Sequence, residues 1–73
     1  MTVEVFKTNV SKRKYAKVLL SGIHKTFSDY RANFDLDDCD RILRVQCNNG
    51  TVCCETLISF LRDHGFYAEP LPD

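Results

Sequence analysis

The sequence predicts an α+β domain whose elements follow the order strand, helix, strand, strand, helix, strand. Segments in which apolar and polar residues alternate predict half-buried strands, and two segments with apolar residues at three- and four-residue spacing predict amphipathic helices. Turn-forming residues separate these segments. The 73 residues allow one domain, 1–73, near the lower size limit for a single apolar core.

The first strand is expected within residues 1–10. Val3 and Val5 alternate with Glu4 and Phe6 in a run of branched and aromatic residues. We expect Val3 and Val5 to face the helices. Phe6 would then lie on the open face of the sheet, as an exposed apolar contact.

A helix follows, with Ser11 as the expected N-cap and an end near Phe27. Its apolar stripe comprises Tyr15, Val18, Leu19, Gly22, Ile23 and Phe27. The next two strands form a hairpin. Ala32, Phe34 and Leu36 alternate with polar residues before the turn DDCD, and Leu43, Val45 and Cys47 alternate with polar residues after it.

The second helix begins after the turn NNG at 48–50, with Thr51 as a possible cap, and ends near Gly65. Its stripe comprises Cys54, Leu57, Ile58 and Leu61. Phe66, Tyr67 and Ala68 predict a short last strand, and the two prolines after it suit an edge strand or a frayed tail.

The order βαββαβ predicts a ferredoxin-like sandwich, in which a four-stranded antiparallel sheet carries both helices on one face. Right-handed crossovers place the helices there, and each apolar stripe needs the sheet to cover it. One end of this fold gathers residues 9–14, 35–40 and 64–67. The other end gathers Cys47, residues 48–51, Cys53 and residues 24–30.

The balance of charge argues against nucleic acid as a partner. Ten basic and ten acidic residues cancel, whereas domains that bind phosphate backbones usually carry a basic excess. No apolar run is long enough to span a membrane, and no signal peptide is recognised at the N-terminus. We therefore expect a cytosolic protein whose four cysteines are reduced.

The chain resembles the heavy-metal-associated domain family, the small copper and zinc carriers that also occur as modules of metal-pumping ATPases. The resemblance rests on the element order and on ETLISFLRDHGFYAE at 55–69, which is similar to the closing helix, glycine and aromatic strand of the family. It implies the same ferredoxin-like fold.

The family's metal loop, Met-x-Cys-x-x-Cys, lies between the first strand and the first helix. Aligned on Leu19 and Ile23, the loop has Val10 at the methionine, Lys12 at the first cysteine and Tyr15 at the second. Both thiolate ligands are missing, and a protonated lysine has no lone pair to offer a metal. We expect no metal in this loop and no cofactor.

Lys12, Arg13 and Lys14, here called the cationic cluster, crowd the expected start of the first helix. The cluster could bind an anion or an acidic partner. Alternatively, solvated pairs with neighbouring acids could neutralise it. These acids are Asp35, Asp37, Asp38 and Asp40. A calcium site at DLDDCD is disfavoured because the spacing of a calcium loop is absent.

The leading hypothesis is a protein-interaction or regulatory module that uses the cationic cluster, Tyr67 and Phe6. A homodimer through the open sheet face is also considered. One alternative is a metal-binding or redox-sensing domain that uses Cys47, Cys53 and Cys54, with His24 as a further ligand. Another is a purely structural small domain with no ligand. An enzyme is not expected, because His24 and His64 are predicted at opposite ends.

Overall fold

The computed structural model describes residues 2–72 and contains the six predicted elements in the predicted order. The predicted domain limits, Met1 and Asp73, lie outside the described residues. The elements are β1 (Thr2–Thr8), α1 (Arg13–Thr26), β2 (Tyr30–Asp35), β3 (Ile42–Cys47), α2 (Cys54–Asp63) and β4 (Ala68–Pro70). Neither helix is long and apolar enough to cross a membrane, as judged over the described residues.

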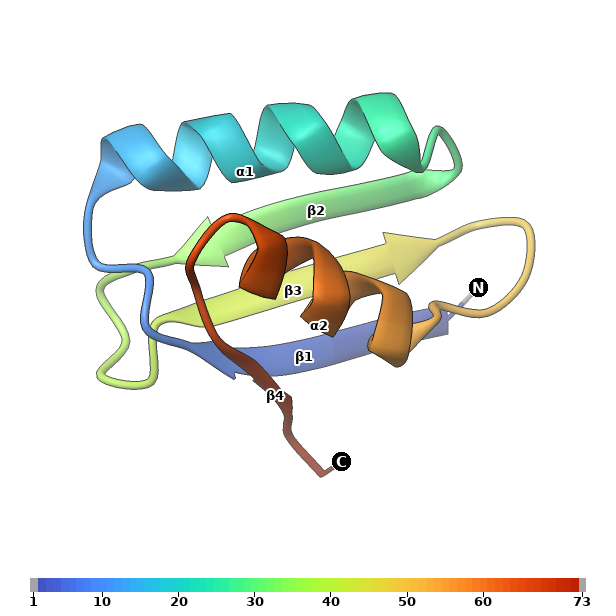
Figure 1. Cartoon of the computed structure of the whole chain (residues 1–73). Helices are drawn as coiled ribbons and strands as arrows, with labels where there is room; N and C mark the ends of the chain where they lie inside the picture. The colour runs from blue at the N-terminus through green and yellow to red at the C-terminus, as the bar shows by residue number, and fades with distance from the viewer. Residues whose placement is uncertain (1, 73) are drawn as a thin grey trace.

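The four strands form one antiparallel sheet in the order β2-β3-β1-β4, and both helices cover the same face (Figure 1). This arrangement confirms the predicted ferredoxin-like α+β fold. Because β1 and β3 lie in the centre, β2 and β4 are the two edges. Each βαβ unit therefore encloses a strand of the other, which joins the two halves into one core.

The face of β1 that packs against the helices is the opposite of the predicted one. Phe6 is fully buried and is paired with Leu43, whereas Val3 is 40% exposed. A strand turns alternate side chains to opposite faces, so placing Phe6 inside places Val3 and Val5 outside. Branched side chains favour a strand on either face, and the larger aromatic ring gains more from burial. Phe6 is therefore a core residue and not an exposed contact.

The rest of the core follows the predicted stripes except in α1, where Tyr15 and Val18 are exposed and Ala16 is buried instead. The buried residues of α1 are Ala16, Leu19 and Ile23, while Val18 is 60% exposed. Leu57 and Leu61 bury the facing side of α2. The two helices come close at Gly22, where an added Cβ would lie 2.6 Å from Cζ of Phe60. That glycine serves close packing of the helices.

The end of α2 explains why β4 starts later than predicted. The amide of Phe66 donates to the carbonyl of Leu61 at 2.9 Å, and Gly65 donates to Arg62 at 2.9 Å with φ of 85°. This pattern is a Schellman cap, whose left-handed position favours glycine. It uses Phe66 to close the helix, so the predicted strand Phe66–Ala68 becomes Ala68–Pro70.

Candidate functional site

The end of the sheet that carries the cationic cluster is held together by hydrogen bonds from Thr8 and Asn9. The amide of Thr8 donates to the carbonyl of Asp40 at 3.1 Å, and its hydroxyl donates to the carbonyl of Arg41. The amide of Tyr67 donates to Oδ1 of Asn9 at 2.8 Å. These bonds fix the loop before α1 against the hairpin turn and the loop before β4, as the topology predicted.

The helix α1 begins without a side-chain cap. Its N-cap is Lys12, with φ of −115° and ψ of 135°, and not Ser11 as predicted. A lysine ammonium has no acceptor atom, so it cannot bind the free amides of the first turn. That turn also contains no acidic residue. The positive end of the helix dipole therefore coincides with three cationic side chains.

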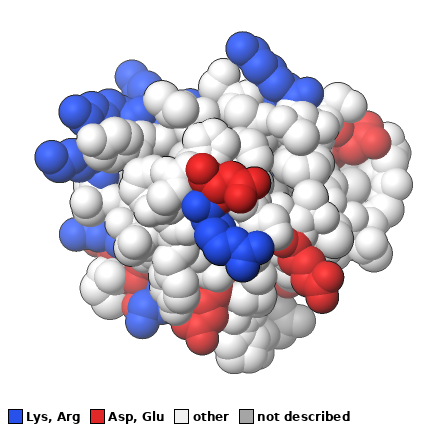
Figure 2. Space-filling model, in the orientation of Figure 1, with Lys and Arg blue, Asp and Glu red and all other residues white. Residues whose placement is uncertain are grey.

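No acidic side chain among the described residues forms a direct ion pair with this cluster. Within residues 2–72, the one ion pair at 4.0 Å or less joins Lys7 to Asp40, with Nζ 3.9 Å from Oδ1. Direct pairs between the cationic cluster and the aspartates of the hairpin turn, the alternative considered from the sequence, are thus not formed at this distance. Figure 2 shows basic side chains gathered on the side of the molecule where α1 begins. The cluster is a concentrated positive surface on a chain of zero net charge.

Tyr15 adjoins the cationic cluster, and Tyr67 lies in the loop before β4, near Ile58 and Arg62 of α2. Tyr15 is 41% exposed and packs against Phe66, with ring centroids 5.6 Å apart, and Nζ of Lys14 lies 5.1 Å from the centre of the Tyr15 ring. Tyr67 is 49% exposed and donates its hydroxyl hydrogen to Glu69 at 2.6 Å. Accepting this hydrogen, the Glu69 carboxylate raises the pKa of Tyr67. Tyr15 gives the charged surface rigid apolar area.

The sequence predicted Tyr67 and the cationic cluster as contact residues but did not include Tyr15 among them. The helical spacing placed Tyr15 in the apolar stripe, and the family alignment placed it at a missing ligand. The structure puts it on the border between core and solvent. An aromatic ring beside a lysine in one helical turn was the available signal.

The residues aligned with the family's metal loop are structural or cationic. Val10 is fully buried, Lys12 is the N-cap of α1, and Tyr15 packs on Phe66. None of these side chains offers sulfur or imidazole. The loop therefore has no donor set for a soft metal.

The three cysteines at the opposite end have different environments. Cys47 is buried in the core, while Cys53 is exposed at the N-cap of α2. The hydroxyl of Thr56 donates to Sγ of Cys53 at 3.0 Å and lowers the pKa of that thiol. Burial, with the nearby Glu4 carboxylate as a smaller cause, raises the pKa of Cys54.

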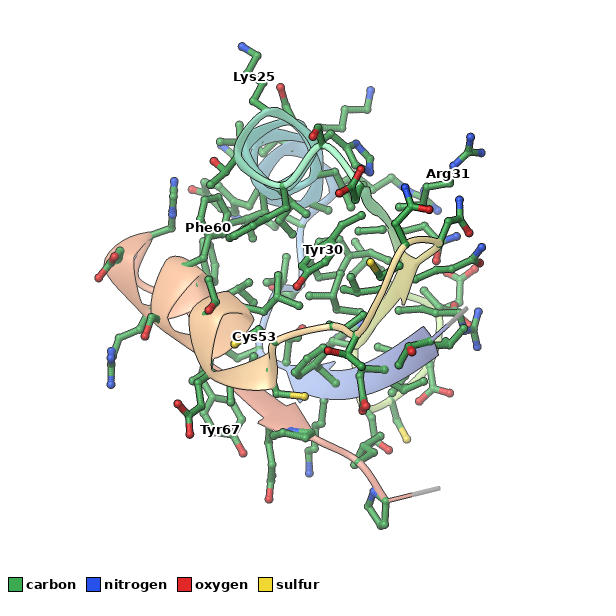
Figure 3. All side chains as sticks on the ribbon, turned by 90° about the vertical axis from the view of Figure 1, so that its right-hand side faces the viewer. Lys25, Tyr30, Arg31, Cys53, Phe60 and Tyr67 are labelled. Atoms are coloured by element: carbon green, nitrogen blue, oxygen red, sulfur yellow. The ribbon has the colours of Figure 1, made fainter. Side chains whose placement is uncertain are left out.

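These cysteines do not converge with His24 on a metal position. Over residues 2–72, the one group of three potential ligands within 4.8 Å is Asp38, Cys39 and Asp40, three neighbours in the hairpin turn. Nε2 of His24 instead accepts the amide hydrogen of Ala32 at 3.1 Å. Figure 3 shows Cys53 beneath Tyr30, whose hydroxyl oxygen accepts the Cys53 amide hydrogen at 2.9 Å. This end of the fold is thus organised by backbone hydrogen bonds.

His64 is the C-cap residue of α2 and packs back against that helix. Its ring packs on Phe60 with centroids 4.5 Å apart, and Nδ1 lies 2.9 Å from the carbonyl oxygen of Phe60. The ring lines a shallow groove together with Gly22 and Lys25 of α1. Each histidine thus has a ring nitrogen at a backbone group, and neither has a cysteine as its hydrogen-bond partner among the described residues.

The open face of the sheet is mainly polar. The pairing across β1, β3 and β2 forms one row of Val3, Gln46 and Arg31, and a second row of Val5, Arg44 and Asn33. Phe6 lies on the other face and cannot contribute to a homodimer through this one. No family model matches the chain, and neither a curated protein nor a solved structure shows significant similarity to it.

Proposed function

We propose that this chain is a protein-interaction domain that resembles heavy-metal-associated domains but has lost their metal loop. Its docking surface is the cationic cluster together with Tyr15 and Tyr67, and its partner is a protein with an acidic face. The observation that carries the proposal is the placement of Lys12, Arg13 and Lys14, without ion pairs among the described residues, at the positive end of α1.

The placement of the cationic cluster at the start of α1 has an energetic cost. Each exposed cation at a helix N-terminus is unfavourable by about 0.3–1 kcal/mol. Sequences that violate a local stability rule commonly do so at functional sites. A partner carboxylate would remove the repulsion and would add charge-assisted hydrogen bonds. The charges that destabilise the start of α1 in the free protein would therefore strengthen the binding of an acidic partner there.

The chemistry of the surface favours a folded protein over a long polyanion. Asp37 and Asp38 lie in the hairpin turn at the same end as the cationic cluster, and Glu69 lies beside Tyr67. A nucleic acid or an anionic membrane would meet these acids as well as the cations. A protein can present complementary charges of both signs, which fixes orientation and speeds encounter. Tyrosine is also enriched among the residues that dominate protein interfaces.

The remaining expectations fit a binding role. We propose no catalytic function and no cofactor, because the functional surface consists of cations and phenols without a nucleophile and base in contact. We also propose a cytosolic location. All four cysteines are free thiols, which suits a reducing compartment.

The test is affinity capture from a lysate of the source organism, with recovered proteins quantified by mass spectrometry. The bait is compared with the variant Lys12→Glu, Arg13→Glu, Lys14→Glu. The matched control is Lys25→Glu, Arg31→Glu, Arg44→Glu, which makes the same change in charge at other exposed positions. The proposal expects proteins that the wild type and the control recover and the cluster variant loses. Identical recoveries by all three baits would contradict it.

A further inference from the structure

The β2 edge of the sheet is closed along one half and open along the other. Alternate residues of a strand direct their backbone amides and carbonyls to opposite sides in the plane of the sheet. The backbone groups of Tyr30, Ala32 and Phe34 therefore point away from β3. The amide of Tyr30 donates to the carbonyl of Phe27 at 2.9 Å, and the amide of Ala32 donates to His24. Among the described residues, the amide of Phe34 has no such partner outside the sheet ladder.

The opposite edge of the sheet is better protected. β4 has three residues and ends in Pro70, which has no amide hydrogen to donate. Unpaired edge strands attract further strands, and proteins usually shorten or cover them. The open half of β2 is thus the accessible edge of this sheet.

A groove lies along this open half, between α1 and β2. It has a volume of about 160 Å³. Its apolar lining comes from Ala16 and Leu20 of α1 and from Phe34 and Leu36 beside the edge. Arg13 and Lys17 provide its charged groups, and no acidic residue lines it. The groove can therefore hold one apolar side chain with carboxylates nearby.

We propose that an extended acidic segment of a partner protein adds to β2 as a fifth strand, pairing with Phe34 and occupying the groove beside Arg13 and Lys17. This inference rests on the proposed function and names its partner more closely. Main-chain hydrogen bonds to an edge strand supply affinity, while pockets for alternate side chains supply specificity. The two cations select a segment in which acidic residues alternate with an apolar one.

The structure also limits the length of the added strand. His24 blocks the edge at Ala32, and the Leu36 carbonyl oxygen accepts a hydrogen bond from the Arg41 guanidinium. Within β2, the outward groups between these points are the carbonyl of Ala32 and the amide and carbonyl of Phe34. A segment of three or four residues fits this opening, so a single peptide would bind weakly and the cationic cluster would add to its affinity.

The experiment selects binders from a displayed library of random peptides against immobilised wild-type protein. Enriched peptides are then synthesised and titrated into the labelled protein, with amide exchange followed by NMR. The inference expects alternating acidic and apolar residues in the enriched peptides. It also expects exchange of the Phe34 amide to slow at least tenfold when the peptide is bound.

Two matched variants separate groove binding from general attraction. Lys17→Glu removes a groove cation, and Lys25→Glu makes the same change at a residue that projects from α1 away from the sheet (Figure 3). Lys17→Glu should weaken peptide binding roughly tenfold and Lys25→Glu less than about twofold. A chemically synthesised chain with N-methylated Phe34, which keeps the ring and removes the outward amide hydrogen, should abolish binding.

The contrary results are distinct. Peptides that bind only at the cationic cluster and leave Phe34 exchange unchanged would overturn the fifth strand but keep the proposed function. Failure to enrich any peptide would also overturn it, and the capture experiment would still judge the proposed function separately. Slow Phe34 exchange in a peptide-free dimer, detected by sedimentation, would assign the edge to a second copy and contradict a partner segment.

Discussion

The two helices begin at opposite ends of the sheet and treat the helix dipole in opposite ways. α2 has an acid, Glu55, in its first turn and a base, Arg62, in its last. α1 has no acid in its first turn, and its N-cap is Lys12. Neither N-cap side chain caps a free amide of its helix, so the difference lies in charge. The charges at the start of α2 stabilise the helix, whereas those at the start of α1 destabilise it.

This contrast is informative because the two helices are otherwise anchored alike. Each buries its apolar side against the same face of the sheet (Figure 1). Each also has basic residues in its last turn, as the dipole favours. The unfavourable charges are therefore local to the surface that we propose for docking.

The largest predicted effects on stability come from the buried leucines that hold both helices against the sheet. Leu19 is 1% exposed on α1 and Leu57 is 0% exposed on α2. Leu19→Ala and Leu57→Ala should each lower the free energy of unfolding by about 2–5 kcal/mol, because each leaves a core cavity. Urea denaturation measures both. If either substitution lowers the free energy of unfolding by less than about 1 kcal/mol, that leucine does not anchor its helix in the core.

The next prediction reverses the sign of the charges at the start of α1. Lys12→Glu, Arg13→Glu, Lys14→Glu should raise the free energy of unfolding by about 1–3 kcal/mol at low salt, since each change replaces repulsion from the dipole with attraction. Urea denaturation at low and high salt measures this gain, which should shrink as salt screens it. A variant with a lower free energy of unfolding than the wild type would contradict the proposed repulsion at the start of α1.

The corresponding change in α2 should have the opposite sign. Glu55→Lys puts a cation in the first turn of a helix that now has an acid there, and it should lower the free energy of unfolding by about 0.5–1 kcal/mol. Partner capture should be unchanged, because this residue lies at the other end of the fold. Glu55→Gln removes the charge without reversing it, so its free energy of unfolding should lie between those of the wild type and Glu55→Lys.

The smallest effect concerns thiol reactivity at the start of α2. The Thr56 hydroxyl lowers the pKa of Cys53, while burial raises the pKa of Cys54. Since the thiolate reacts, alkylation of Cys53 should reach half its maximal rate at a lower pH than alkylation of Cys54. Mass spectrometry after timed iodoacetamide treatment measures both profiles. Thr56→Val should move the Cys53 profile to higher pH, and coincident profiles before that change would contradict the assignment.

The sequence was sufficient for the order and type of every element, because each has a clear hydrophobic period and a turn signal at its ends. Gly65 marked the end of α2, and Pro70 marked β4 as an edge strand. The face of β1 could not be predicted, because Val3 and Val5 compete with Phe6 for the core. Only the pairing of Phe6 with Leu43 decides between them.

The candidate site was partly predictable for a similar reason. Lys12, Arg13 and Lys14 are adjacent in sequence, so their clustering needs no tertiary information. Whether the aspartates of the hairpin turn neutralise them depends on distances that only the fold provides. The open edge at Phe34 likewise depends on which backbone groups face β3 and on the position of His24.

The most direct test of the central claim is the association rate of a captured partner with the wild-type protein as a function of salt, measured by stopped flow. Steering by the cationic cluster predicts that the rate falls roughly tenfold or more between low and high ionic strength, with that dependence lost in the cluster variant. A rate that is independent of salt, or equal for both proteins, would contradict the account.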